Sequence, residues 1–314
     1  MKKESILHIM PLNIKQMFRY LDEKMLAGIQ EIRLRIGQPI IIIAGNSEYG
    51  ISETGICGID KSYIVQDKDI EAIVHLISGF SLYALEDEMK QGYITIEGGH
   101  RVGIAGKAVI ENGNVKTIRN ISAMNIRIAH EVIGCSREVL PYIISRERIY
   151  HTLIVSPPKC GKTTLLRDIV RSLSNGFSGY GPYTIGVVDE RSEIAACYLG
   201  VPQNDIGVRT DVLDSCPKVE GMRMLLRSMA PDVIVVDEIG KREDILAIEE
   251  VLGAGITIIS TVHGKDIEDC LKKPLLSEML REKLFERIVI LSSQYGPCTI
   301  ENILDAQNEF KVLR

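Results

Sequence analysis

The second half of the chain alternates short apolar runs with longer amphipathic stretches. Five runs rich in valine and isoleucine have the composition of strands that are buried on both faces: 153–155, 184–188, 233–236, 256–260 and 287–291. Between them lie stretches with apolar residues at helical spacing, such as 241–253. This alternation predicts right-handed crossovers and a mainly parallel sheet covered by helices, which is an α/β fold.

The first half of the chain has a different pattern. Residues 31–36 alternate apolar and charged side chains, and Gly37-Gln38-Pro39 turns the chain towards 40–44. Such alternation predicts a hairpin with one face in water. We also predict helices over 69–77 and 82–89, and strands over 93–97, 101–109, 115–118 and 126–128. The chain should therefore hold a smaller α+β domain over 1–140, a linker over 141–148 and a second domain over 149–314.

A glycine-containing loop joins the first apolar run of the second domain to a predicted helix. It consists of Ser156, Pro157, Pro158, Lys159, Cys160, Gly161, Lys162, Thr163 and Thr164. A strand, a tight loop and a helix in this order form a phosphate-binding loop, because backbone N–H groups and the helix N-terminus attract anions. We expect Lys162 to reach the β- and γ-phosphates of ATP and the Thr163 hydroxyl to ligate Mg²⁺.

This loop departs from the usual G-x-x-x-x-G-K-[ST] pattern at one position, where Ser156 replaces the first glycine. Pro157 and Pro158 stiffen the turn, and serine tolerates unusual backbone angles less easily than glycine. The alternative is a Gly-Lys-Thr sequence in an ordinary surface turn. The apolar run before the loop and the amphipathic stretch after it favour the phosphate-binding loop.

A second acidic motif supports this interpretation. The run 233–236 ends in Asp237 and Glu238. A buried parallel strand would deliver both carboxylates to the carboxyl edge of the sheet, where ligands of open α/β sheets bind. We expect Asp237 to hold the Mg²⁺ shell and Glu238 to orient or deprotonate the attacking water.

Composition limits the other possibilities. The chain has 314 residues, 45% of them hydrophobic, a net charge of −5 and a pI near 5.8, so no overall basic field favours nucleic acid. Seven cysteines without a C-x-x-C pair suit a reducing cytosol. Cys160 lies in the phosphate loop, where a small buried filler is favoured over a redox sensor. No segment has the length and apolarity of a membrane span or signal peptide, so we expect no direct membrane insertion.

Four segments resemble the secretion-traffic ATPases of type II and type IV systems: 156–164, 187–194, 226–240 and 260–264. The run 188–194 looks like the "Asp box" of that family, with Glu193 at the position of its catalytic glutamate. Residues 260–263 look like its "His box", which ends in His263. The resemblance implies a RecA-like P-loop core in a hexameric ring, preceded by an N-terminal domain. One difference is that the family usually has Gly-Glu where this chain has Asp237-Glu238.

A narrower family resembles nearly the whole chain: stage III sporulation protein AA. The shared features are the Pro-Pro of the loop, the run 189–191, the predicted hairpin at 29–39 and the segment 207–212. This resemblance implies a cytoplasmic ATPase, peripheral at the mother-cell side of the forespore membrane. Its partners would be membrane proteins of a channel complex between mother cell and forespore.

Several roles stay open at this stage. Glu193 and Glu238 compete for the part of the base. His263 either contacts the γ-phosphate or forms structural hydrogen bonds. Arg101, Arg127 and Arg227 are candidates for a positive charge that stabilises the transition state.

Alternative functions also stay open. A RecA-like nucleic-acid-dependent ATPase would share the same core, although the acidic charge and the lack of a basic, aromatic-rich stripe count against it. A scaffolding subunit that binds ATP with little turnover and a small-molecule kinase are the other two. No acceptor-binding motif for a kinase is visible.

Overall fold

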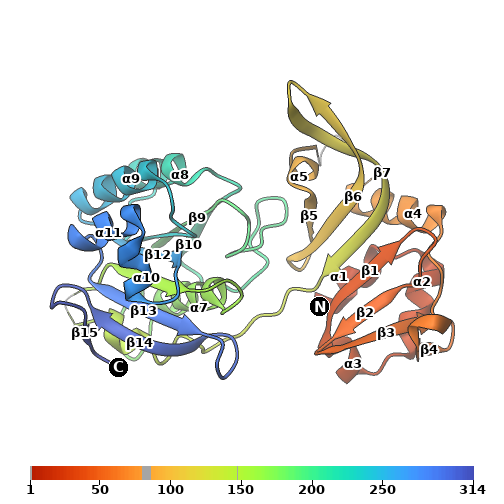
Figure 1. The fold of residues 1–314 in the computed structure, drawn as a ribbon, viewed down its shortest axis with the longest axis horizontal. Helices are drawn as coiled ribbons and strands as arrows, with labels where there is room; N and C mark the ends of the chain where they lie inside the picture. Colours follow the sequence, from red (N-terminus) through yellow and green to blue (C-terminus); the bar gives the residue numbers. More distant parts are fainter. Residues whose placement is uncertain (1, 80–85, 147) are drawn as a thin grey trace. The chain divides into compact units, whose positions relative to one another are not determined.

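The computed structural model describes residues 2–79, 86–146 and 148–314, and the chain divides into two compact units, Met1–His130 and Glu131–Arg314 (Figure 1). The division falls ten residues before the boundary that we predict from the sequence. The short helix α6 (Leu140–Ile143) explains the difference, because Leu140 and Ile143 are fully buried in the core of the second unit. The predicted linker over 141–148 is therefore largely part of that unit, and residue 147 lies outside the described residues.

The first unit is built on an antiparallel sheet. Its described strands follow the order β4-β3-β2-β1-β7-β6-β5. They are β1 (Ile29–Arg35), β2 (Ile41–Ala44), β3 (Ser47–Ser52), β4 (Gly55–Cys57), β5 (Tyr93–Ile96), β6 (His100–Glu111) and β7 (Asn114–Arg127). The predicted hairpin is confirmed by the antiparallel pairing of β1 with β2. The two strands predicted over 115–118 and 126–128 are one long strand, β7, which stays paired with β6 through two register shifts.

The helices of the first unit pack their apolar residues into one core with the sheet. They are α1 (Lys2–His8), α2 (Leu12–Met17), α3 (Glu23–Gly28), α4 (Asp67–Ser78) and α5 (Glu86–Gln91), with 3₁₀ turns at Phe18–Tyr20 and Ile59–Lys61. The helix predicted over 69–77 is confirmed as α4. Its Asp69 carboxylate accepts the Gln66 N–H at 2.9 Å, which caps the first turn. Of the helix predicted over 82–89, residues 82–85 lie outside the described residues.

The second unit contains the predicted α/β sheet, extended by antiparallel strands. The order within the described residues is β10-β9-β11-β12-β8-β13-β14-β15, and neighbours from β10 to β13 are parallel. The predicted runs form β8 (Thr152–Ser156), β9 (Ile185–Asp189), β11 (Val233–Val236), β12 (Thr257–His263) and β13 (Arg287–Ser292). Three strands were not predicted: β10 (Thr210–Asp214), β14 (Thr299–Asp305) and β15 (Lys311–Val312).

Helices cover both faces of this sheet (Figure 1). Successive residues of β8 point to opposite faces, so Ile154 joins the core that contains α7 (Lys162–Asn175), while Leu153 and Val155 join the other core. The opposite face carries α8 (Lys218–Ser228), α9 (Arg242–Gly253), α10 (Ile267–Lys272) and α11 (Pro274–Arg281). In the described parts of the chain, none of the helices combines the length and apolarity that a bilayer crossing requires.

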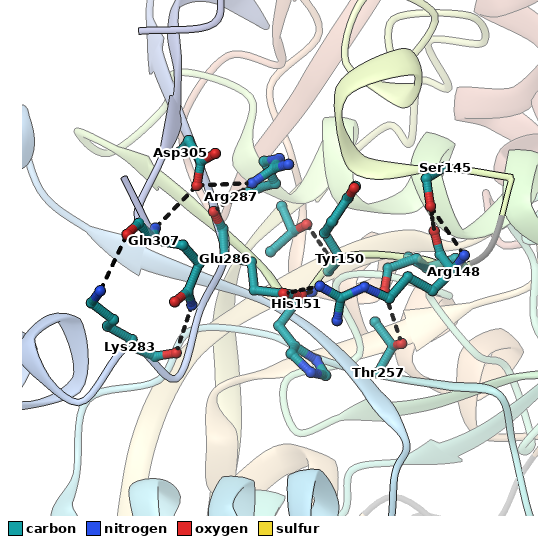
Figure 2. A network of polar contacts seen from close by, with 12 residues as sticks. Ser145, Arg148, Tyr150, His151, Thr257, Lys283, Glu286, Arg287, Asp305 and Gln307 are labelled. Carbon is teal, nitrogen blue, oxygen red and sulfur yellow. Dashed lines mark hydrogen bonds and ion pairs between the residues drawn. The ribbon is translucent and has the colours of Figure 1, made fainter. Parts of the chain in front are cut away.

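A network of polar contacts joins segments at the amino ends of β8 and β13 (Figure 2). The Glu286 carboxylate is 7% exposed and accepts hydrogen bonds from Arg148 at 2.5 Å and from the backbone N–H of His151 at 3.1 Å. Arg287 forms an ion pair with Asp305 at 3.1 Å. Because ligands of parallel sheets bind at the carboxyl edge, this network lies at the structural end of the sheet.

Candidate functional site

The carboxyl ends of four neighbouring parallel strands bring the predicted site residues together. Strands β9, β11, β12 and β8 are consecutive in the sheet. His263, the last residue of β12, lies in register beside Ser156, the last residue of β8. Val236 of β11 pairs with Val188 of β9, so Asp237 and Asp189 leave the sheet side by side. Residues far apart in the sequence thus meet at one edge.

The phosphate loop has the backbone that its sequence predicts. Lys159 and Gly161 adopt positive φ angles of 64° and 92°, and α7 begins at Lys162. Ser156 is buried in the extended backbone of β8, and its hydroxyl donates to the Pro157 carbonyl at 2.8 Å. Serine is therefore compatible with this position, because extended backbone does not require glycine. The first N–H groups of α7 have no acceptor within the helix and point to where a phosphate would sit.

A chain of hydrogen bonds runs from Lys162 to Glu238. The Lys162 ammonium donates to Nδ1 of His263 at 2.6 Å. Since an ammonium has no acceptor capacity, Nε2 of His263 carries the ring proton and faces Glu238 Oε2 at 3.0 Å. Lys162 is 8% exposed, and burial lowers its pKa, while the charges of Glu238 and Asp237 oppose that effect. The ammonium is thus desolvated at the mouth of the phosphate loop.

Asp237 is held beside this chain of contacts. It is 7% exposed, and its Oδ1 accepts a hydrogen bond from the Thr261 hydroxyl of β12 at 3.2 Å. Mg²⁺ is usually bound through one or two carboxylates together with substrate phosphates and water. A buried carboxylate next to a phosphate-binding lysine, with the Thr163 hydroxyl at the start of α7, fits that coordination pattern.

Glu193 lies in a loop that is fixed from two sides. The Asp189 carboxylate accepts the backbone N–H groups of Glu193, Ile194 and Ala195 at 2.8, 2.9 and 2.8 Å. Burial raises the pKa of Asp189 to about 6, against the lowering effect of these hydrogen bonds. From α7, Arg167 donates to the carbonyls of Glu193 and Ile194 at 2.7 and 2.6 Å. Glu193 therefore lies on a loop tied directly to the helix that follows the phosphate loop.

Arg191 was not singled out by the sequence analysis. Its guanidinium lies 3.8 Å from Glu238 Oε2, in the same loop as Glu193. The only hint in the sequence was its place within the run 188–194. In contrast, Arg101 stacks on the Tyr93 ring at 4.0 Å and Arg127 pairs with Glu31 at 3.3 Å, all within the first unit. The remaining candidate, Arg227, lies on α8.

The fold is similar to solved structures of secretion and pilus ATPases. The ATPase DotB of Legionella pneumophila matches with a TM-score of 0.57 and 14% identity, over 90% of this chain and 78% of that chain. The pilus retraction motor PilT, solved with bound ADP, matches with a TM-score of 0.57 and 17% identity, over 91% and 77% of the two chains. At these identities the likeness shows the fold alone, which is the α/β fold of these ATPases.

A much closer relative is found by sequence. Stage III sporulation protein AA of Bacillus subtilis (strain 168) is 42% identical over 300 residues, which cover 96% of this chain and 94% of the relative. The family model described as "Sporulation stage III, protein AA" matches residues 1–310. The chain therefore belongs to the family of sporulation stage III protein AA.

Proposed function

We propose that the protein is an ATP-hydrolysing motor with a RecA-like P-loop core, of the secretion-ATPase type. One observation carries the proposal: Lys162, His263 and Glu238 form a continuous chain of contacts at the mouth of the phosphate loop. It supports ATP chemistry because it links the lysine that would hold the phosphates to the carboxylate that would hold the water.

The residues of the site divide the work in the following way. The loop 156–164 and the N-terminus of α7 hold the phosphates, and Lys162 neutralises the β- and γ-oxygens. Thr163 and Asp237 hold Mg²⁺, which supplies charge neutralisation between the phosphates. Glu238 orients the attacking water and accepts its proton. Glu193 stays in the second shell of water and metal.

Two further groups act on Glu238. A phosphate competes with His263 for the Lys162 ammonium, so nucleotide binding releases His263 and with it the Glu238 carboxylate. Arg191, at 3.8 Å from Glu238, supplies a positive charge from the same chain near the γ-phosphate position. The site therefore senses the γ-phosphate through a pair of contacts that the nucleotide itself rearranges.

The biological role follows from the family. We propose that the motor acts as a homo-oligomer, in a hexameric ring, and energises a transport or channel complex between mother cell and forespore. It would be cytoplasmic, peripheral at the mother-cell side of the forespore membrane, and bound to membrane proteins of that complex. The family membership and the likeness to secretion ATPases support this role.

ATP turnover measured against oligomer size tests the proposal. Wild-type activity should rise with protein concentration, because a ring completes its sites only after assembly. Lys162→Ala should abolish hydrolysis, since it removes the phosphate-binding charge, whereas Lys272→Ala, at an exposed position of α10, should leave turnover unchanged.

Two results would contradict parts of this proposal. Full-rate hydrolysis by a monomer would exclude the ring. Failure of the wild type to bind ATP in excess Mg²⁺ would exclude the site. Stimulation by single-stranded DNA or RNA that weakens with salt would favour the nucleic-acid-dependent alternative.

A further inference from the structure

The turn before β14 packs directly against the phosphate loop. The backbone N–H of Cys298 donates to the Cys160 carbonyl at 2.8 Å, and its thiol lies 3.3 Å from the Gly161 carbonyl. A Cβ placed on Gly161 would come within 2.6 Å of the Cys298 sulfur. Cys298 therefore fills the space that the glycine leaves and supports the loop from behind.

A second thiol reaches the same place from another part of the chain. The Cys135 sulfur lies 3.8 Å from the carbonyl of Thr164, in the first turn of α7. The thiols of Cys135 and Cys298 are hydrogen-bonded to each other. Both cysteines are half-buried, and neither forms part of a disulfide. Two free thiols thus meet at the start of the helix that follows the phosphate loop.

The surroundings make the two thiols unequal. The hydrogen bond from Cys135 lowers the pKa of Cys298 and raises that of Cys135. The backbone N–H of Leu165 and the charge of Arg167 also lower the pKa of Cys298, against burial and the charge of Asp168. A thiolate at a helix N-terminus is the usual form of a reactive cysteine. Cys298 is therefore the nucleophile of the pair, and Cys135 is placed to react second.

We propose that Cys298 and Cys135 form an oxidation site, which a hydroperoxide converts into an intramolecular disulfide beside the phosphate loop. The Cys298 thiolate attacks the O–O bond of hydrogen peroxide, gives the sulfenic acid and releases hydroxide, which a proton converts to water. Cys135 then attacks the Cys298 sulfur, forms the S–S bond and releases a second water. Two thiols and one peroxide thus give one disulfide and two waters.

The disulfide changes the support of the phosphate loop. Cys298 loses the S–H group that faces the Gly161 carbonyl, and the segments around Cys135 and Cys298 become covalently joined across the start of α7. Loss of one neutral hydrogen bond corresponds to an equilibrium change of roughly 2- to 10-fold. Oxidation should therefore weaken nucleotide binding by about that factor, and a dithiol reductant should restore it.

The disulfide is tested on the full-length protein with hydrogen peroxide, followed by alkylation of the remaining thiols and mass spectrometry without reduction. A linked peptide pair containing Cys135 and Cys298 is expected. Either Cys298→Ser or Cys135→Ser should abolish it. Cys197→Ser should not, because Cys197 is 3% exposed and burial raises its pKa to about 12. If peroxide leaves Cys135 and Cys298 free in the wild type, or links Cys298 to another cysteine, the proposal fails.

The effect on binding is measured by titration of a fluorescent ADP analogue into reduced, oxidised and re-reduced protein. This second arm rests on the proposed function, whereas the mass-spectrometric arm does not. Equal affinity of reduced and oxidised protein would overturn the effect on the loop. Reduced wild type that binds no nucleotide would overturn the proposed function and the effect on binding, while the linked peptide still decides whether the oxidation site exists.

Discussion

At the scale of single residues, the partner of each charged group decides what the site can do. The Lys162 ammonium donates to the imidazole of His263, and this ring separates it from Glu238. A direct ion pair between Lys162 and Glu238 would be a charge-assisted contact that an incoming phosphate must break. A neutral imidazole is a weaker competitor. The buried lysine therefore remains available for phosphate while the carboxylate is kept close to it.

Two isosteric substitutions distinguish the candidate bases. Glu238→Gln should lower ATP hydrolysis by about 10²–10⁴, because it removes the group that accepts the proton of the water. ADP binding should be retained, since the phosphate loop is unchanged. Glu193→Gln should reduce turnover much less. Steady-state hydrolysis and ADP titration on both variants check this, and a larger loss in Glu193→Gln than in Glu238→Gln would reverse the assignment.

The sequence pattern could locate only part of this site. Lys162, Asp237 and His263 were predicted because each follows or ends a buried strand, and parallel strands deliver such residues to one edge. Cys298 could not be placed against Gly161 in this way. Its position depends on the antiparallel pairing of β13 with β14, which no short motif encodes. Arg191 depends likewise on the path of a loop held by Asp189 and Arg167.

At the scale of elements, the reliability of prediction followed burial. Every residue of β8, β9 and β11 is buried, and such strands appear as continuous apolar runs. In contrast, the five residues of β10 are half-buried and read Thr-Asp-Val-Leu-Asp, which has no such run. Strand β10 lies at the edge of the sheet, where only one neighbour covers it. Its pairing with β9 could therefore be found only in the structure.

Two glycines in helices test how closely α8 packs on the sheet. Gly221→Ala places a Cβ 2.4 Å from Val188 Cγ1, a branched side chain of a buried strand. Overpacking of this kind typically costs about 1–3 kcal/mol. The matched control is Gly253→Ala at the end of α9, where no atom lies within 4 Å of the added Cβ. There the substitution should be neutral or stabilise the protein by up to about 1 kcal/mol.

Thermal unfolding of the two variants beside the wild type checks this contrast. The melting temperature should fall for Gly221→Ala and stay equal or rise for Gly253→Ala. Equal melting temperatures would mean that α8 can shift away from β9 at little cost.

The network at the amino ends of the strands should make stability depend on pH. His151 Nδ1 accepts the Ile258 N–H at 3.3 Å, which requires an unprotonated Nδ1 (Figure 2). Burial lowers the pKa of His151, Glu286 opposes this, and Arg148 adds to it. Unfolded histidine has a pKa of about 6.5. Below that pH the unfolded chain binds more protons than the folded one, so the contribution of His151 to stability falls as the pH falls.

Urea unfolding between pH 7.5 and 5.5 measures this contribution. Asp189 acts in the opposite sense, because its pKa is raised to about 6 and the folded state gains its proton first. The difference between wild type and His151→Gln therefore isolates the histidine, since glutamine does not titrate. The wild type should lose more stability than the variant on acidification, whereas His75→Gln should behave as the wild type. Parallel curves for wild type and His151→Gln would contradict the prediction.

At the scale of the whole molecule, the division of the chain follows its cores. Each unit has its own buried cluster, and the segment 131–140 belongs to the second one. Ser136 is fully buried and donates to the Asp168 carboxylate of α7 through its N–H at 2.8 Å and its hydroxyl at 2.7 Å. The sequence could not show this, because 131–140 carries no strong helical or strand period and only its contacts assign it to a unit.

Two fragments that differ only in this segment test the boundary. The fragment 131–314 should fold cooperatively, because it keeps the whole second core. The fragment 141–314 loses Val139 and Leu140 from that core and removes both Ser136 donors from Asp168, which is 2% exposed. A buried carboxylate without its partners and a cavity in the core each cost several kcal/mol, a large share of the stability of a typical domain. The shorter fragment should therefore aggregate or melt far below the longer one by circular dichroism, and equal melting would return the boundary to 140.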